Sequence, residues 1–347
     1  MNEERKKEHV EICLTKKVNS HHNYWDNVRL FHNALPEVDK SEVNLKVNFL
    51  GKQLAAPLVI SGMTGGYPEA KKINRNLAIA CEKHQIALGV GSQRAALDKP
   101  KLEGTYTVIK DYDLPLRIAN IGLPQLIQHD KNRALEKVRK CVEMIDANAI
   151  ALHLNFLQEA IQPEGSTKAK GCLEIIRSIA SELGVPLIIK ETGAGISYEI
   201  AKSLASTKIS AIEVGGLSGT SFATIESYRA KAQGDYIREK LGQTFREWGI
   251  PTPVSILEVK RACKDRIPIV GTGGIRNGLD AAKSIALGAQ IAGIAGAVIR
   301  EGVSSAEEVA EKVGIMIEEL RTACFLCGTR DVADLSKQRV EMWYGHE

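Results

Sequence analysis

Eight short apolar runs alternate with amphipathic helical stretches along most of this chain, and this alternation limits its possible folds more than any other feature. The runs cover residues 57–61, 87–91, 116–120, 149–155, 186–190, 211–215, 267–271 and 291–295. Each run is continuously apolar, which is typical of parallel strands covered on both faces. Eight strand–helix units predict an α/β protein with a (β/α)8 TIM barrel, and a doubly wound sheet is the alternative.

The segments between the runs carry the helical period. Apolar side chains recur on one face of residues 134–145, and again over residues 309–320. Ser305 and Glu308 have the spacing of a capping box at the start of the second helix. These two amphipathic helices support the predicted strand–helix alternation.

The chain has no Gly/Ser-rich linker and no low-complexity tract, so residues 1–347 are predicted to form one domain. The barrel core spans about residues 57–323, and residues 1–56 precede it as an N-terminal arm. The segment 216–264, after the sixth run, is longer than a connection with one crossover helix needs to be. We therefore expect an extended region after strand six.

Composition excludes several classes of function. The net charge of +4 is weak and its basic residues are scattered, which argues against a nucleic-acid partner. The apolar run at 291–299 is too short to cross a bilayer, and the charged N-terminus lacks the apolar core of a secretory signal. Seven dispersed cysteines favour a reducing compartment, so we expect a cytoplasmic protein with no membrane partner.

The candidate site residues follow the apolar runs, and the C-terminal ends of the strands carry the chemistry in a β/α barrel. The fourth run stops at four closely spaced polar residues, His153, Asn155, Gln158 and Glu159. The residues of interest that follow the other runs are Met63, Thr64, Gly65, Ser92, Arg94, Asn120, Lys190, Thr220, Gly273, Gly274, Arg276, Ala295 and Gly296. We expect these positions to line a common site.

Glycines after the seventh and eighth runs predict a phosphate site. Gly273 and Gly274 precede Arg276, and Gly296 follows the last run. Glycines beside helix starts let backbone N–H groups approach a phosphate closely. One glycine pair alone is more often only a tight turn. Two such loops in successive units favour phosphate binding.

Lys190 ends a buried run, where an unpaired ammonium group is costly. A reduced flavin, which is negative near its N1 and O2 atoms, would meet this charge. The alternative is an ion pair with a neighbouring carboxylate such as Glu191.

His153 and Glu159 can each be interpreted in more than one way. The histidine is a base, a hydrogen-bond donor or a buried structural residue, and the nearby Asn155 and Gln158 favour a role in the site. Glu159 is either an oxygen ligand for Mg2+ or a carboxylate favoured by a helix N-terminus. Spacing alone does not separate the two interpretations of Glu159.

Two further motifs carry less information. Arg5, Lys6 and His9 belong to a basic cluster of a kind that is common on solvated termini. Cys324 and Cys327 form a lone CxxC, which predicts two packed thiols rather than a zinc site.

Taken together, the motifs resemble those of a known family, the flavin-dependent type 2 isopentenyl diphosphate isomerases. No single motif is decisive, but their order and their coverage of nearly the whole chain are specific. The matching segments are 5–6, 8–9, 63–66, 91–94, 153–155, 158–159, 162–165, 190–191, 219–221 and 273–276.

The resemblance implies an enzyme of isoprenoid biosynthesis that interconverts isopentenyl and dimethylallyl diphosphate by 1,3-allylic proton transfer. It implies FMN that must be reduced, with NADPH or NADH as reductant, and it implies Mg2+. The reaction has no net redox change. The resemblance also implies a homo-tetramer or homo-octamer.

The resemblance further implies a role for each matching residue. Gln158 and His153 would be catalytic, and Glu159 would bind Mg2+. The residues implied to bind substrate are Arg5, Lys6, His9, Ser92, Arg94, Asn155 and Gln158. The residues implied to bind FMN are Met63, Thr64, Gly65, Ser92, Asn120, Lys190, Thr220, Gly273, Gly274, Arg276, Ala295 and Gly296.

The main alternative is an FMN-dependent barrel oxidoreductase of the 2-hydroxy-acid oxidase or dihydroorotate dehydrogenase kind. Hydroxy-acid oxidases need a histidine base and an arginine near the loops after strands six and seven, and residues 214–217 contain no histidine. A non-catalytic flavin- or phosphate-binding protein is a third alternative. It would leave the convergence of His153, Gln158, Glu159 and Arg94 unexplained.

Overall fold

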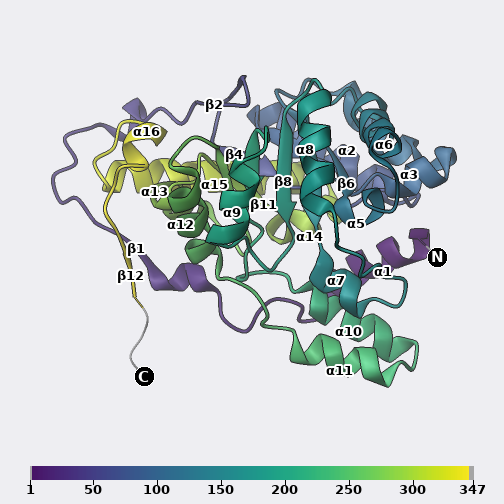
Figure 1. The fold of residues 1–347 in the computed structure, drawn as a ribbon. Coiled ribbons are helices and arrows are strands. Elements are labelled where there is room, and N and C mark those ends of the chain that lie inside the picture. Colours follow the sequence, from purple (N-terminus) through teal and green to yellow (C-terminus); the bar gives the residue numbers. More distant parts are fainter. Residues whose placement is uncertain (1, 344–347) are drawn as a thin grey trace.

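The computed structural model of the protein describes residues 2–343, and at its centre eight parallel strands close into a barrel (Figure 1). The strands are β4 (Leu58–Ile60), β5 (Ala87–Gly89), β6 (Arg117–Gly122), β7 (Ala149–Leu154), β8 (Leu187–Glu191), β9 (Ala211–Glu213), β10 (Ile269–Thr272) and β11 (Ile291–Ile294). β4 pairs with both β5 and β11, so the sheet has no free edge. The predicted barrel and its eight strands are therefore confirmed, and the doubly wound sheet is wrong.

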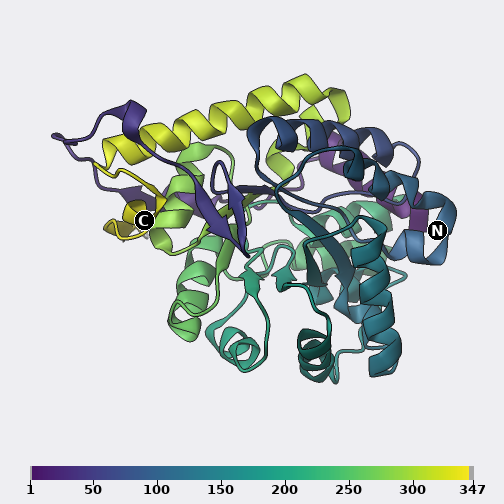
Figure 2. The ribbon, with the colours of Figure 1, turned by 90° about the horizontal axis from the view of Figure 1, so that it is seen from above.

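Helices surround the barrel, and α15 lies along α2 on its outside (Figure 2). The longer helices are α2 (Ala70–His84), α6 (Lys131–Met144), α8 (Cys172–Glu182), α9 (Tyr198–Ala205), α12 (Thr252–Cys263), α13 (Gly278–Leu287) and α15 (Ala306–Leu326). The shorter helices are α3 (Arg94–Asp98), α4 (Gly104–Thr107), α5 (Leu123–Leu126), α7 (Phe156–Ile161), α14 (Ile299–Ser304) and α16 (Val332–Leu335). The two helices predicted from apolar periodicity correspond to α6 and α15.

The start of α15 forms only half of the predicted capping box. The Ser305 hydroxyl accepts a hydrogen bond from the backbone N–H of Glu308 at 3.2 Å, as expected of an N-cap residue. The Glu308 carboxylate, however, accepts from the hydroxyl of Ser304 rather than from the Ser305 backbone. The helix therefore begins where the sequence predicts, with a different partner for Glu308.

The barrel interior is filled by side chains and is closed at its N-terminal end by a hairpin. Small and branched residues such as Ala87, Ala149 and Ile188 point inward from the strands. Phe49 and Leu54, from the antiparallel hairpin β2 (Val47–Phe49) and β3 (Lys52–Leu54), are fully buried against them. The barrel is thus a packed core, and its C-terminal end is left for the site.

The predicted N-terminal arm has two parts with different positions. Helix α1 (Asn2–Thr15) contacts α10 and α14, whereas β1 (Val28–Leu30) pairs antiparallel with β12 (Val340–Met342). Between them, the buried Trp25 donates from Nε1 to the carbonyl of Gly273 at 2.9 Å. The arm is therefore attached to the barrel at several points, which supports our proposal that the chain forms one domain.

The predicted extension after strand six is confirmed. It contains α10 (Phe222–Ala232) and α11 (Tyr236–Thr244) before the barrel helix α12, and α10 packs against α7 (Figure 1). Both α7 and α10 follow the C-terminal ends of their strands. The extension therefore forms part of the wall around that end of the barrel. Among the helices within residues 2–343, none combines the length and the apolar character that a membrane span needs.

Candidate active site

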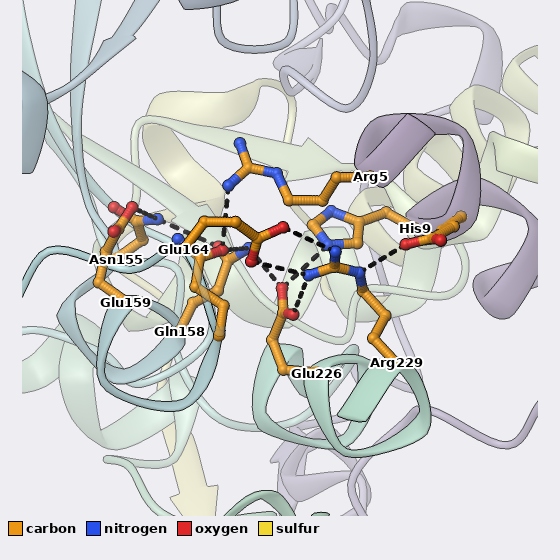
Figure 3. Close-up of polar contacts among 10 residues, drawn as sticks. Arg5, His9, Asn155, Gln158, Glu159, Glu164, Glu226 and Arg229 are labelled. Carbon is orange, nitrogen blue, oxygen red and sulfur yellow. Dashed lines mark hydrogen bonds and ion pairs between the residues drawn. The ribbon is translucent and has the colours of Figure 1, made fainter. Parts of the chain in front are cut away.

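Helix α7 begins directly after β7 and carries two of the predicted site residues, Gln158 and Glu159, which are 8% and 3% exposed. Asn155, at the N-cap position, donates from Nδ2 to Oε1 of Gln158 at 3.1 Å and to Oε1 of Glu159 at 3.3 Å (Figure 3). One amide group thereby orients both side chains. The strand-to-helix junction, rather than any flexible loop, positions them.

The Gln158 side chain is hydrogen-bonded through both of its polar atoms. Its oxygen accepts from Asn155, and its nitrogen donates to Oε1 of Glu226 at 3.0 Å and to Oε1 of Gln162 at 3.3 Å. A carboxylate accepts and does not donate, so the Glu226 contact identifies the amide nitrogen. The Gln158 amide is therefore held in one orientation.

Glu226 is a residue that the sequence analysis missed. Its side chain on α10 is fully buried and accepts from His9 Nε2 at 2.9 Å and from Arg229 Nη1 at 2.7 Å. Burial alone would raise the pKa of Glu226, but the His9 hydrogen bond and charge and the Arg229 charge lower it to about 2. The carboxylate is therefore an anion throughout the working pH range. The only sequence signal was an E-x-x-R pair in a region longer than a crossover requires.

Helix α1 brings the predicted basic residues of the arm to the same place. Arg5 donates from Nη1 to Oε1 of Gln162 at 3.2 Å, and its buried Nε has no hydrogen-bond partner. Lys6 donates to the Tyr106 hydroxyl at 2.7 Å and to the backbone carbonyl of Ser92. The arm is thus docked against loops that follow the strands, and the solvated-terminus interpretation of this cluster is wrong.

Three basic side chains, Arg5, Lys6 and Arg94, lie close together where the arm docks, and their positive charges repel one another. Burial, followed by the charges of Arg5 and Arg94, lowers the pKa of Lys6 to about 7. Arg94 forms an ion pair from Nε to the Asp98 carboxylate at 3.7 Å. A polyanion would relieve this repulsion. The arrangement therefore suits a diphosphate.

Glu159 is held by neutral donors only. Its carboxylate accepts from Gln125 Nε2 at 3.1 Å, from Asn155 Nδ2 and from the backbone N–H of Ser166 at 2.7 Å. The nearby Oδ1 atom of Asn155 is buried without a hydrogen-bond partner. Carboxylate and amide oxygens are ligands that Mg2+ accepts, so these residues fit that ion. Within residues 2–343 no group of three or more acidic, histidine or cysteine side chains could hold a metal, so such an ion would need other oxygens as well.

His153 is buried in β7 and is neutral. Asn120 donates from Nδ2 to the Val90 carbonyl at 3.0 Å, so its Oδ1 accepts from His153 Nδ1 at 2.8 Å. Burial, followed by the charge of Lys190, lowers the pKa of His153 to about 3. The hydrogen bond to Asn120 leaves Nε2 unprotonated. His153 can therefore accept a hydrogen bond at Nε2.

Lys190 has a carboxylate partner, but it is not Glu191. Its ammonium group pairs with Glu213 on β9. Glu191 instead accepts backbone N–H groups of residues 192–195 at its Oε2 atom. The alternative of an ion pair with a carboxylate is therefore found, but Glu213 takes the place of Glu191. Lys190, Glu213, Asn120 and other residues line a small cavity at the C-terminal end of the barrel, where the buried Ser61 hydroxyl has no hydrogen-bond partner.

The loops after β9, β10 and β11 come together, and they include the two glycine loops for which we predict a phosphate site. Gly273 and Gly274 have φ angles of 113° and 74°, and a Cβ on Gly274 would meet the Ser218 carbonyl at 2.4 Å. A Cβ on Gly296 would lie 3.2 Å from the Thr220 hydroxyl. Asn23 fixes the Gly274 carbonyl by donating from Nδ2 at 2.8 Å. The backbone here forms a tight glycine cradle, in which Gly273 and Gly274 adopt conformations that favour glycine and Gly296 is less restricted.

The remaining residues predicted to bind FMN lie in the loops that follow β4, β10 and β11. Arg276 is held by carboxylates, from Nη2 to Asp26 at 2.6 Å and from Nε to Asp280 at 2.8 Å, so its guanidinium is already paired. Gly65 has a φ of 146° and lies against the Tyr106 ring, and the Thr64 carbonyl accepts from the Gly91 N–H at 2.9 Å. Met63 is half-buried beside them, and Ala295 is the N-cap residue of the 3-10 helix Gly296–Val298.

The barrel and the family match together define a flavin-dependent barrel protein. The FMN-dependent dehydrogenase family matches residues 166–342. A solved mandelate oxidase and a variant of it share the fold, with TM-scores of 0.64 and 0.67 and identities of 14% and 15%, over 97–99% of each chain.

Full-length relatives are more specific. This chain is 45% identical to the isopentenyl-diphosphate delta-isomerase of Thermoplasma volcanium over 98% of its own length and 96% of the relative. It is 46% identical to the enzyme of the same name from Methanothrix thermoacetophila over 97% and 92%. The chain belongs to the isopentenyl-diphosphate delta-isomerase family. These relatives favour the isomerase over the predicted oxidoreductase alternative.

Proposed function

We propose that this protein interconverts isopentenyl and dimethylallyl diphosphate with reduced FMN and Mg2+. The observation that carries the proposal is the joint placement of a cationic group and an oriented amide. Arg5 lies close to Lys6 and Arg94. It donates to the same Gln162 oxygen as the Gln158 amide does. The cations suit the diphosphate, and the neutral Gln158 amide suits the hydrocarbon part of the substrate. The proposal thus accounts for the charged and the neutral parts of the site.

FMN would be held by two sets of residues. The glycine cradle of the β10 and β11 loops, with Thr220, suits the phosphate. Lys190, Asn120 and His153 surround the small cavity or lie beside it, and they suit the polar edge of the ring. When bound and reduced, FMN supplies an electron-rich ring that stabilises positive charge on the allylic unit and exchanges protons with it.

The residues of this chain would control where protons and charge go. One end of the allylic unit gains a proton and the other end loses one. Gln158, a neutral amide, can relay a proton without trapping a cation, whereas a carboxylate nucleophile would trap it. His153 would keep its Nε2 atom as an acceptor toward the ring. Glu159 and Asn155 would hold Mg2+ against the diphosphate.

Four further assignments belong to the same proposal. NADPH or NADH would reduce the flavin, and the protein would assemble as a homo-tetramer or homo-octamer. Its place would be the cytoplasm, which is supported by the free thiols of all seven cysteines in the described residues. Cys324 and Cys327 are among these free and buried thiols, as packed thiols would be.

Anaerobic turnover tests this function. The protein is incubated with isopentenyl diphosphate and Mg2+, with FMN either reduced or oxidised, and dimethylallyl diphosphate is measured together with solvent deuterium uptake. We expect turnover only with reduced FMN. Lys190→Met should lose FMN binding, and the exposed Lys208→Met is the matched control. Full activity with oxidised FMN in air would overturn the proposal, and oxidation of a 2-hydroxy acid would favour the oxidoreductase.

A further inference from the structure

The guanidinium of Arg229 is surrounded by three carboxylates from three separate segments. Its Nε donates to Glu8 at 2.7 Å, its Nη2 to Glu164 at 2.8 Å and its Nη1 to Glu226 at 2.7 Å (Figure 3). The Arg229 side chain is only 3% exposed. These four residues are called the Arg229 cluster below. No predicted site residue belongs to it.

Each carboxylate connects Arg229 to a part of the candidate site. Glu8 lies on α1, which also carries Arg5, Lys6 and His9. Glu164 lies in the loop after α7, two residues beyond Gln162, whose Oε1 accepts from Arg5. Glu226 accepts from Gln158 and His9. The guanidinium is the point where the arm, the loop and α10 meet.

We propose that Arg229 is a positioning residue that fixes helix α1 and the Glu164 loop around Glu226, so that closure of the arm and orientation of Gln158 depend on one side chain. The proposal rests on the function proposed above only for its kinetic consequences. Docking of the arm is a property of the protein itself and can be measured without turnover.

Geometry explains why this position is an arginine. A guanidinium presents donors in a planar fork and can bind several carboxylates at once, whereas an ammonium group acts as a single point charge. All three kinds of nitrogen in Arg229 are used, each toward a different carboxylate. A lysine would keep the charge but lose this geometry. Arg229→Lys is therefore the conservative variant of interest.

The charges also depend on Arg229. Glu226 is fully buried, and an unpaired buried carboxylate is strongly unfavourable. The groups that hydrogen-bond to it are His9 from α1, Gln158 from α7 and Arg229 from its own helix, and the charge of Arg5 on α1 also acts on it. Arg229 is the permanent cation that hydrogen-bonds to Glu226. Its removal would leave the carboxylate hydrogen-bonded to a histidine and an amide, with Arg5 acting on it through charge alone.

Arg229 hydrogen-bonds to the three carboxylates and not to Gln158 or Asn155, so it acts on Gln158 through Glu226. It is thus distinct from the residues proposed to touch substrate. Its loss should change substrate affinity through the arm and turnover through Gln158. FMN affinity should stay unchanged because the glycine cradle is held by other residues.

The sharpest test is Glu8→Gln, because Glu8 is 37% exposed and its substitution leaves the core intact. We expect faster backbone hydrogen exchange in residues 2–15 of the FMN-loaded protein. The KM for isopentenyl diphosphate should rise about tenfold, which corresponds to about 1.4 kcal/mol, and kcat should stay within about twofold. Glu11→Gln is the matched control on the same helix, where Glu11 is 59% exposed and lies 4.0 Å from Lys7.

Arg229 itself is tested with Arg229→Lys and Arg229→Met. We expect both to lower kcat and raise KM, and Arg229→Met to move the acid limb of the kcat–pH profile toward neutral by at least one pH unit. Lysine should restore the pH profile but not the KM. A merely structural role would lower the apparent kcat through loss of folded protein, without changing KM or moving the pH profile.

The outcomes separate this inference from the proposed function. If Glu8→Gln has the same hydrogen-exchange rates in residues 2–15 and the same KM as Glu11→Gln, Arg229 does not dock the arm and the inference is overturned. This result would decide the question even if the Arg229 variants fail to fold. If wild-type protein has no isomerase activity, the proposed function fails. The hydrogen-exchange comparison then still decides whether the Arg229 cluster holds the arm.

Discussion

The amide nitrogen of Gln158 donates a hydrogen bond to Oε1 of Glu226 at 3.0 Å, across 68 residues of sequence. Glu226 is an anion, so it fixes the amide with its N–H groups toward α10 and its oxygen toward Asn155. A neutral side chain that rotates freely could not relay a proton in one direction. The hydrogen bond gives Gln158 a defined polarity within the site.

Replacing Gln158 tests its proposed relay role. Gln158→Leu keeps similar bulk and removes donor and acceptor, so turnover should fall about 100-fold or more, the scale of losing a proton-transfer group. Binding of reduced FMN and substrate should change little, and solvent deuterium exchange should fall in parallel. Gln128→Leu, at an exposed position, is the control. Wild-type turnover and exchange in the leucine variant would make Gln158 only a pocket wall.

Glu159→Gln tests the proposed Mg2+ site. The variant removes the charge of one ligand while keeping an oxygen in place, and the neighbouring Asn155 oxygen stays available. Since even outer-shell changes cost about 10–100-fold in metal affinity, half-maximal activity should need at least about tenfold more Mg2+. Flavin absorbance should be unchanged. Glu174→Gln, on the outside of α8, is the control, and an unaltered Mg2+ titration of Glu159→Gln would refute the metal role.

Removal of residues 1–9 tests the arm as a lid. It deletes Arg5, Lys6 and His9, so the KM should rise about 100-fold or more, as expected when paired charges in a binding site are lost. FMN affinity should stay within about twofold, because Asn23 and Trp25 still hold the glycine cradle. A longer deletion through residue 25 should lose FMN as well. Equal loss of substrate and FMN in the short deletion would make α1 a folding element.

Lys6 should take up a proton when a diphosphate binds. Its pKa of about 7 leaves it mostly neutral at pH 8 in the free protein, and a nearby polyanion would raise that pKa. Calorimetric titration at pH 8 in buffers of different ionisation enthalpy should show proton uptake approaching one per bound diphosphate. Uptake should vanish below about pH 5.5, where Lys6 is already charged. Lys6→Met should abolish the uptake, and a wild-type protein without it would contradict the prediction.

Much of the fold follows directly from the sequence. Continuous apolar runs can be stable only where both faces of a strand are covered, so they locate the barrel strands to within a few residues. The polar residues that stop those runs, such as His153 and Asn155, then fall at one end of the barrel because parallel strands share direction. The same reasoning places Gln158 and Glu159. Neither inference requires a knowledge of side-chain contacts.

Glu226 and Arg229 could not be found in this way. They lie in the middle of α10, more than ten residues along the chain from the end of β9, and their importance comes from the residues that α1 and α7 bring to them. Helical spacing explains only their contact with each other. The docking of the arm likewise depends on packing between segments more than 200 residues apart, such as Glu8 and Arg229.

The partner of Lys190 shows where sequence reasoning stops. The sequence alone established that a buried lysine ends the fifth strand and requires an anion. It suggested the adjacent Glu191, but successive side chains on a strand point to opposite faces. Register places Lys190 beside Glu213 on β9, so these two side chains share a face and meet. The local sequence pattern determined the strand and the requirement for an anion beside Lys190. Only closure of the barrel decided that Glu213 supplies this anion, because the pairing register depends on the whole sheet.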